Sequence, residues 1–276
     1  MKRRTFLKTA GASALGLAGL AGVVRNSLRQ PHISKRKPNY IVVTMDTTRK
    51  DHLGCYGYHR NTSPNLDKFA DESIVFEDAY GTSHGTLPNH NSIFTGLYPY
   101  NHGVLSNKRI IPPGIPNLGD WLREQGYETI GVTSTSFLNK QTTGNCFKTV
   151  FNSQEYERRS EYTIDEAISV LDWLNTRKNP FFLWVHLWDP HFQYNPPKEF
   201  KGKFFKEEGS ERVIQFLTQK VEDPAEQFER LSLLRLTELE QEVIKGRYDE
   251  EIAYMDSQIG RFLHELKKEN YMIVQL

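Results

Sequence analysis

A threonine at position 86 stands two residues before a proline, in the segment 81–90. Pro88 suits the first turn of a helix continuing through Ile93 and Phe94, so we expect Thr86 at or just before that helix's N-terminus. Free backbone N–H groups and the helix dipole there favour an anionic oxygen, phosphate or sulfate. Metal coordination could make the hydroxyl a nucleophile, although a threonine here could equally be a simple N-cap.

Asp46 directly follows residues 40–45, a short apolar run that is typical of a buried strand. Its hard carboxylate would suit a divalent cation, although an aspartate at this position could also cap a loop. Ligands of open parallel sheets bind beyond the carboxyl ends of the strands, so Asp46 is a candidate site residue.

A second apolar run, 181–188, carries His186 inside it and leads into Asp189, Pro190 and His191. The proline cannot continue a strand ladder, so the run should stop there. We expect Asp189 and His191 to point into the same crevice as the carboxylate that follows the first run. They could ligate a metal, contact an anion or move a proton.

Residues 81–85 also satisfy G-x-S-x-G, the nucleophile elbow of serine hydrolases, with Ser83 as the nucleophile. An elbow needs its helix to begin immediately after the serine. Here a glycine and then Pro88 delay the helix, which disfavours this alternative.

Strands and helices alternate along the chain. Short apolar runs predict strands at 40–45, 74–76, 129–133 and 181–188. Helix signals occur at Ser63-Pro64, at Asn117, at a capping box formed by Thr163 and Glu166, and over about 248–268. Residues 198–246 are charged and should be helical, with a break at Pro224. This order predicts an α/β fold with a largely parallel sheet and helices on both faces.

The charge of the chain is unevenly distributed. Nine of the 35 Lys and Arg residues, and no Asp or Glu, lie in residues 1–37, which leaves a remainder near −8. So acidic a remainder argues against binding a nucleic-acid backbone. Cys55 and Cys146 could form one disulfide, but two partly buried thiols are the simpler interpretation.

The basic start precedes a small-residue apolar stretch that is too short to span a bilayer comfortably. Arg3 and Arg4, followed by Phe6, Leu7 and Lys8, resemble a twin-arginine signal over residues 1–24. An uncleaved membrane anchor is the alternative. Residues 25–38 should be a linker, and the working part is expected in the periplasm or outside the cell.

The motifs, taken together and in this order, resemble the amino-terminal part of the catalytic domain of the sulfatase family, within the alkaline phosphatase superfamily. The matching segments are 38–49, 54–57, 63–67, 86–90, 95–99, 102–104, 189–191 and 248–260. The resemblance implies metal-dependent hydrolysis of sulfuric or phosphoric esters of small molecules, lipids or carbohydrates. It implies a calcium, zinc or manganese ion held by Asp46 and Thr86, and Thr86 as the nucleophile. His90 and His191 would be catalytic, and Asn89 and His191 would contact the substrate.

Several residues depart from the sulfatase pattern. True sulfatases have Cys or Ser, oxidised to formylglycine, where this chain has Thr86, and an Arg where it has His90. Thr47 stands where many relatives have a second acidic ligand. Thr86 cannot become formylglycine and resembles the threonine nucleophile of nucleotide pyrophosphatase/phosphodiesterases and phosphoethanolamine transferases. The chemistry therefore leans toward phosphate esters.

Residues 271–274 are expected to form the strand that leads, in relatives, into an Asp-His-Gly segment completing the metal site. Residues 39–276 would then be an incomplete catalytic domain with weak or absent metal binding. A truncated or inactive homologue and a phosphoethanolamine-type transferase remain alternatives. An Asp-His-Gly in the coding sequence beyond Leu276 would favour the enzyme.

Overall fold

The computed structural model describes residues 37–205, 210–219, 229–231, 233–269 and 271. Contacts divide the chain into two units, Met1–Pro38 and Asn39–Leu276. The expected signal and all but two residues of the expected linker lie outside the described residues, as does most of the expected strand 271–274. None of the described helices combines the length and apolar character that a membrane crossing requires.

Four parallel strands form the sheet in the order β1-β4-β2-β3. They are β1 (Tyr40–Met45), β2 (Glu128–Thr133), β3 (Thr149–Asn152) and β4 (Phe181–Leu187). Every residue of β4 is buried, as its unbroken apolar sequence predicts for a central parallel strand. Because β1 and β4 are parallel neighbours in the sheet, their carboxyl ends lie side by side.

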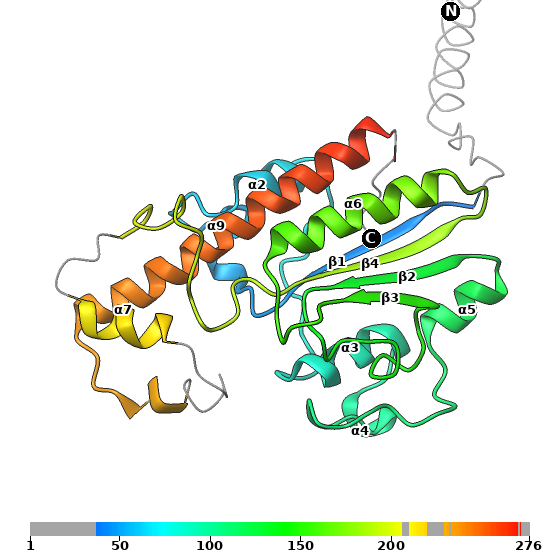
Figure 1. Cartoon of the computed structure of the whole chain (residues 1–276), viewed down its shortest axis with the longest axis horizontal. Coiled ribbons are helices and arrows are strands. Elements are labelled where there is room, and N and C mark those ends of the chain that lie inside the picture. The colour runs from blue at the N-terminus through cyan, green and yellow to red at the C-terminus, as the bar shows by residue number, and fades with distance from the viewer. Residues whose placement is uncertain (1–36, 206–209, 220–228, 232, 270, 272–276) are drawn as a thin grey trace, which may run out of the picture. The chain divides into compact units, whose positions relative to one another are not determined.

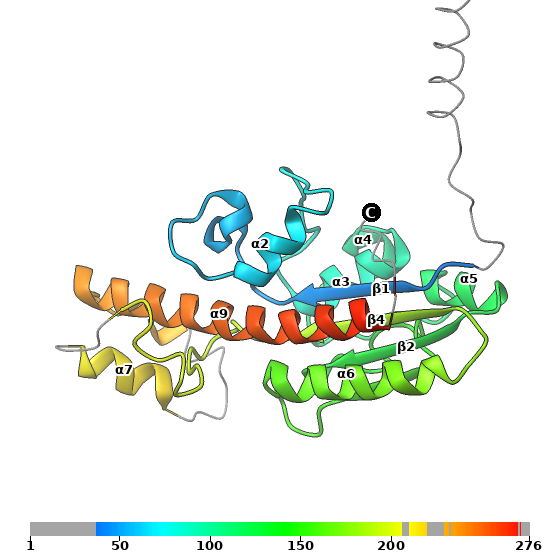
Figure 2. The same ribbon diagram turned by 90° about the horizontal axis from the view of Figure 1, so that it is seen from above.

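Helices cover both faces of the sheet (Figures 1 and 2), which confirms the predicted α/β architecture. One face carries α6 (Ser160–Asn175) and α9 (Glu238–Lys268), which pack on the alternate β4 residues Leu183, Val185 and Leu187. The other face carries α3 (Thr86–Thr95), α4 (Pro99–His102) and α5 (Leu118–Glu124), above Phe182 and Trp184. The two-residue period of the strand divides its side chains between two cores.

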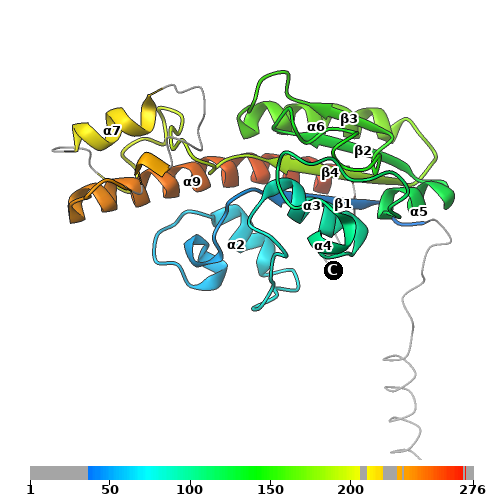
Figure 3. The same ribbon diagram turned by 90° about the horizontal axis from the view of Figure 1, so that it is seen from below.

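Two short helices complete the description. The helix α2 (Pro64–Ala70) begins with the predicted proline and contacts α9. The helix α7 (Glu211–Thr218) lies beside the first part of α9 (Figure 3), where Val213 and Leu217 share a core cluster with Val243.

Four predictions about individual elements are wrong. Residues 198–246 are not helical throughout, since 198–205 and 234–237 are turns or irregular segments. Residues 74–76 are not a strand, and Ile74 and Phe76 remain 61% and 55% exposed. The capping box at Thr163 does not form, because α6 already begins at Ser160 and the Thr163 hydroxyl instead contacts Ser134 at 2.8 Å. The long helix begins ten residues before the predicted position, at a capping box formed by Thr237 and Glu240.

The helix predicted at Asn117 is confirmed, since the Asn117 side chain accepts a hydrogen bond from the amide of Asp120 in the first turn of α5. Cys55 and Cys146 are free thiols, as the simpler interpretation had it.

Candidate active site

Asp46 lies at the carboxyl end of β1, where its amide donates to the carbonyl of Leu187 at 2.9 Å. Its Oδ2 accepts a hydrogen bond from Thr86 Oγ1 at 3.1 Å and contacts Nε2 of His186 at 3.3 Å. Burial would raise the pKa of Asp46, but the hydrogen bond and charge of His186, helped by His90 and His191, hold it below its ordinary value. Two residues 40 positions apart in sequence thus meet as predicted.

Thr86 is the first residue of α3, and Gly85 caps the helix without a side-chain bond. The amide of Leu87 already donates to Asn107 Oδ1 at 2.9 Å, and Pro88 has no N–H. The first three residues of α3 therefore have two N–H groups, and that of Thr86 has no partner in the described part of the chain. This end of α3 therefore offers an anion fewer donors than a typical helix N-terminus.

His186 is the site residue that sequence reasoning left without a role. It is fully buried in β4, on the same side of the strand as Trp184 and Trp188, and its Nδ1 has no partner among the described residues. A histidine alternating with two tryptophans in an otherwise apolar run was the available signal. Because His186 and Thr86 both contact Oδ2 of Asp46, the other carboxylate oxygen is left for a ligand.

His90 lies in the core beneath Thr86, with both ring nitrogens engaged. Nδ1 donates to the carbonyl of Thr86 at 2.8 Å, while Nε2 faces Thr44 Oγ1 at 3.2 Å. That hydroxyl also accepts from the indole N–H of Trp184, so it donates its own proton to His90. Burial, and secondly the charge of His186, lower the pKa of His90 to about 4.

This geometry does not favour the predicted role of His90 in binding or protonating the substrate. A neutral histidine whose two nitrogens are occupied by the protein can position Thr86 through its carbonyl, but it presents no free donor or acceptor to the crevice.

His191 is held by a ring stack on Trp188, with the ring centroids 4.0 Å apart, and by a 2.7 Å contact from Nδ1 to the carbonyl of Phe192. Burial lowers the pKa of His191, although the nearby charge of Asp46 partly opposes this. His191 therefore lies within electrostatic range of Asp46, and its orientation is fixed.

Asp189 does not point into that crevice, contrary to the prediction. Its Oδ2 accepts from the amide of Ser160 at 2.9 Å and from the hydroxyl of Ser160 at 2.5 Å, at the first turn of α6. The orphan amides of a helix N-terminus attract a carboxylate strongly, which explains why Asp189 turns toward α6. It also shares a side-chain hydrogen bond with Glu251 of α9.

The buried Glu251 and the half-buried Asp189 form a carboxyl pair, and the hydrogen bond between them requires a proton on one of the two. Burial, and secondly the charge of Asp189, raise the pKa of Glu251 well above its ordinary value. The folded chain holds a proton here that the unfolded chain releases. Stability should therefore fall as pH rises from the ordinary glutamate pKa through the raised folded value.

Replacing Glu251 by glutamine, which can donate to Asp189 without ionising, should remove that loss. We expect Glu251→Gln to match the wild type near pH ~5 and to be more stable by about 1–3 kcal/mol near pH ~8. Urea unfolding at both pH values measures this, with the exposed Glu124→Gln on α5 as a control that should show no such difference. Equal stability of Glu251→Gln and wild type at the higher pH would contradict the shared proton.

Asn89 and Ser83 shape the loop before α3. Asn89 Oδ1 accepts from the amide and hydroxyl of Thr82 at 2.9 and 3.2 Å, which holds that loop against the helix. The hydroxyl of Ser83 accepts from the amide of Gly85 at 3.2 Å, and α3 begins three residues after it. An elbow serine would stand immediately before its helix, so this geometry disfavours the serine-hydrolase alternative.

Asp46 and Thr86 supply two oxygen donors, the ligand type that hard divalent cations prefer. Within the described residues, no group of three or more His, Cys, Asp or Glu side chains is arranged to hold a metal ion. These two donors fit a divalent cation and would provide part of its coordination.

Comparison with known proteins identifies relatives. The sulfatase family model matches residues 38–274. An N-acetylgalactosamine-6-O-sulfatase of Bacteroides thetaiotaomicron is 30% identical over 119 residues, which are 41% of this chain and 23% of that protein.

Solved structures share the fold. The phosphonate monoester hydrolase of Agrobacterium radiobacter has a TM-score of 0.66 at 18% identity, covering 85% of this chain and 60% of the other. The C-terminal periplasmic domain of EcEptC from Escherichia coli, in complex with zinc, has a TM-score of 0.61 at 18% identity, covering 88% and 63%. The chain thus spans under a quarter of the length of the curated relative, and less than two thirds of either solved structure.

Proposed function

This chain belongs to the sulfatase family, and from that premise we propose that it hydrolyses sulfuric or phosphoric esters with the help of a divalent metal ion. The observation that carries the proposal is the 3.1 Å contact between Thr86 and Asp46 at the carboxyl end of β1. This is where open parallel sheets bind their ligands, and the two oxygens suit a hard cation.

In the proposed reaction, Thr86 Oγ attacks the phosphorus or sulfur atom, and the bond to the alcohol oxygen breaks. The alcohol leaves, Thr86 carries the ester, and water then releases phosphate or sulfate. A cation held by Asp46 and Thr86 would lower the pKa of the attacking hydroxyl. Asp46 stays ionised because its pKa is depressed, so it accepts the Thr86 hydrogen bond but is a poor proton acceptor.

The remaining groups bind and orient. His191, fixed by Trp188 and by the carbonyl of Phe192, would contact the transferred group. Burial favours the neutral form of His191. Nε2 could therefore donate a hydrogen bond to a bound anion only if the negative charge of that anion raised the pKa of His191 enough to protonate Nε2. His90 would position Thr86, and Asn89 would hold the loop that borders the substrate.

The substrate class follows from the nucleophile. Threonine cannot form the aldehyde on which formylglycine sulfatases depend, so we propose that phosphate esters are preferred. The alcohol part would be a small molecule, lipid or carbohydrate. A sulfated carbohydrate is named for one relative and a phosphonate monoester for a structural neighbour. We also propose export through the twin-arginine-like segment 1–24, with residues 39–276 working in the periplasm or outside the cell.

The test is hydrolysis of 4-nitrophenyl phosphate and 4-nitrophenyl sulfate by the purified chain, dialysed and then supplied with calcium, zinc or manganese. We expect little metal to survive dialysis, because the described residues offer only two oxygen ligands. We expect hydrolysis only after metal is added, with the phosphate ester preferred.

Stoichiometric metal after dialysis would contradict the predicted weak binding. Absence of hydrolysis with every metal would favour the inactive homologue. Product formed only with a lipid or sugar acceptor would identify a transferase.

A further inference from the structure

In the described structure, the turn that follows Asp46 has a single side-chain hydrogen bond of its own, a long one of 3.3 Å from the hydroxyl of Thr48 to the carbonyl of Asp46. Thr47 has a φ of 52°, in the left-handed region that a β-branched residue rarely adopts. Thr47 and Arg49 are exposed, and the ladder with β4 ends at Asp46. Among the described residues, the guanidinium of Arg49 bonds only to the exposed carboxylate of Asp51.

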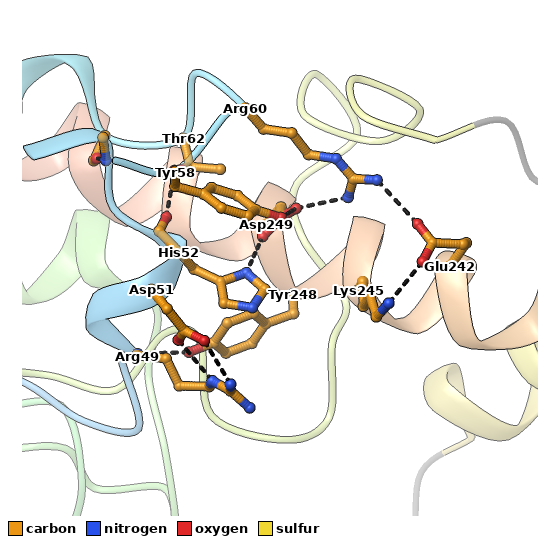
Figure 4. Close-up of polar contacts among 12 residues, drawn as sticks. Arg49, Asp51, His52, Tyr58, Arg60, Thr62, Glu242, Lys245, Tyr248 and Asp249 are labelled. Atoms are coloured by element: carbon orange, nitrogen blue, oxygen red, sulfur yellow. Dashed lines mark hydrogen bonds and ion pairs between the residues drawn. The ribbon is translucent and has the colours of Figure 1, made fainter. Parts of the chain in front are cut away.

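One buried hydroxyl closes this turn from outside. Tyr248 of α9 donates to the carbonyl of Thr47 at 2.8 Å and accepts from the amide of Arg49 at 2.8 Å. It thereby bridges the two backbone groups on either side of Thr48, which are 199 and 201 positions away in sequence. Figure 4 shows Tyr248 beside Arg49. Tyr248 is only 7% exposed, so water cannot easily replace it.

The next residue of α9 fixes the rest of the same loop. Asp249, which is fully buried, accepts from His52 at 2.6 Å and from Tyr58 and Arg60 at 2.7 Å each. Figure 4 shows these side chains converging on one turn of the helix. The turn after Asp46 is therefore attached to α9 through Tyr248, and the loop that follows the turn is attached to the same helix through Asp249.

We propose that Tyr248 is a positioning residue for Asp46: its hydroxyl fixes the turn through which β1 leaves the sheet, and hence the angle at which the carboxylate faces Thr86 and a cation. This inference rests on the metal-binding role proposed for Asp46. Groups that orient a metal ligand typically change metal affinity by about 10- to 100-fold when they are removed.

Tyr248→Phe tests the inference against Tyr254→Phe, a matched variant. Tyr254 is also a buried tyrosine of α9, and its hydroxyl accepts from an amide at 3.1 Å, but that amide belongs to Glu161, in the first turn of α6. Three readouts are needed on the whole chain: NMR amide exchange over residues 47–50, the Thr86 amide shift, and Mn²⁺ binding followed by the EPR signal of free Mn²⁺.

In Tyr248→Phe we expect about tenfold faster exchange in the turn, a displaced Thr86 resonance, and Mn²⁺ binding weakened at least about tenfold or lost. Tyr254→Phe should show none of these. Unchanged exchange in Tyr248→Phe, or faster exchange with unchanged Thr86 shift and Mn²⁺ binding, would overturn the inference. If the wild type binds no Mn²⁺, the metal role of Asp46 fails, and exchange together with the Thr86 shift still decides whether Tyr248 positions Asp46.

Discussion

Replacing Thr86 by alanine is expected to lower hydrolysis of 4-nitrophenyl phosphate by the metal-supplemented chain by about 10³-fold or more, the scale seen when a nucleophile is removed. The variant also loses the hydrogen bond to Asp46 Oδ2, but Asp46 keeps His186 as a partner, so the fold should persist. Steady-state rates with wild type and variant at equal metal concentration measure the loss.

Two matched variants sharpen this test. Thr86→Ser keeps the hydroxyl at the start of α3 and should retain much of the activity. Ser83→Ala removes a hydroxyl three positions away that bonds only the amide of Gly85 in the described structure, and should leave the rate unchanged. Loss of hydrolysis in Ser83→Ala, with activity preserved in Thr86→Ala, would transfer the nucleophile to Ser83.

The meeting of Asp46 and Thr86 was implied by the resemblance to the sulfatase family, whereas sheet topology by itself predicts only the position of Asp46. Both follow strong local signals, an apolar strand for Asp46 and a proline in a first helical turn for Thr86. The rule that parallel strands gather their carboxyl ends at one edge places Asp46 there. It does not place Thr86, because the segment 74–85 before Thr86 is not a strand.

Asp189 and His90 show where local signals fail. A carboxylate at a strand end can turn toward the crevice or toward a neighbouring helix, and the orphan amide of Ser160 decides for Asp189. His90 follows Thr86 by four positions, so on a helix it lies on the same side and reaches back to the Thr86 carbonyl. Whether Nε2 of His90 faces the substrate or the core depends on Thr44 and Trp184, which lie in other elements. The sequence of α3 alone therefore could not predict its environment.

An apolar stripe of α9 packs into the core through Ile252, Met255, Ile259, Phe262 and Leu266. The charged residues of α9 were not expected inside, yet Arg247, Asp249, Glu250, Glu251 and Asp256 are all buried. An amphipathic pattern predicts one buried face, whereas α9 is also covered by the loop 49–62, by α2 and by the segment after β4. Partners so distant in sequence leave no periodic signal.

Replacing Asp249 by alanine is expected to cost about 3–5 kcal/mol of unfolding free energy, because it breaks a buried ion pair and removes the acceptor shared by three side chains. Arg60, only 18% exposed at its side chain, would keep Glu242 as a partner at 3.1 Å, but His52 and the hydroxyl of Tyr58 would lose theirs. Asp165→Ala is the control. It breaks an exposed ion pair between Asp165 of α6 and Arg261 of α9, and it should cost less than about 1 kcal/mol. Urea unfolding measures the free energy of unfolding of both variants. Equal losses would show that the loop 49–62 is held by its apolar contacts. Asp249 would then lack the anchoring role that its three donors indicate.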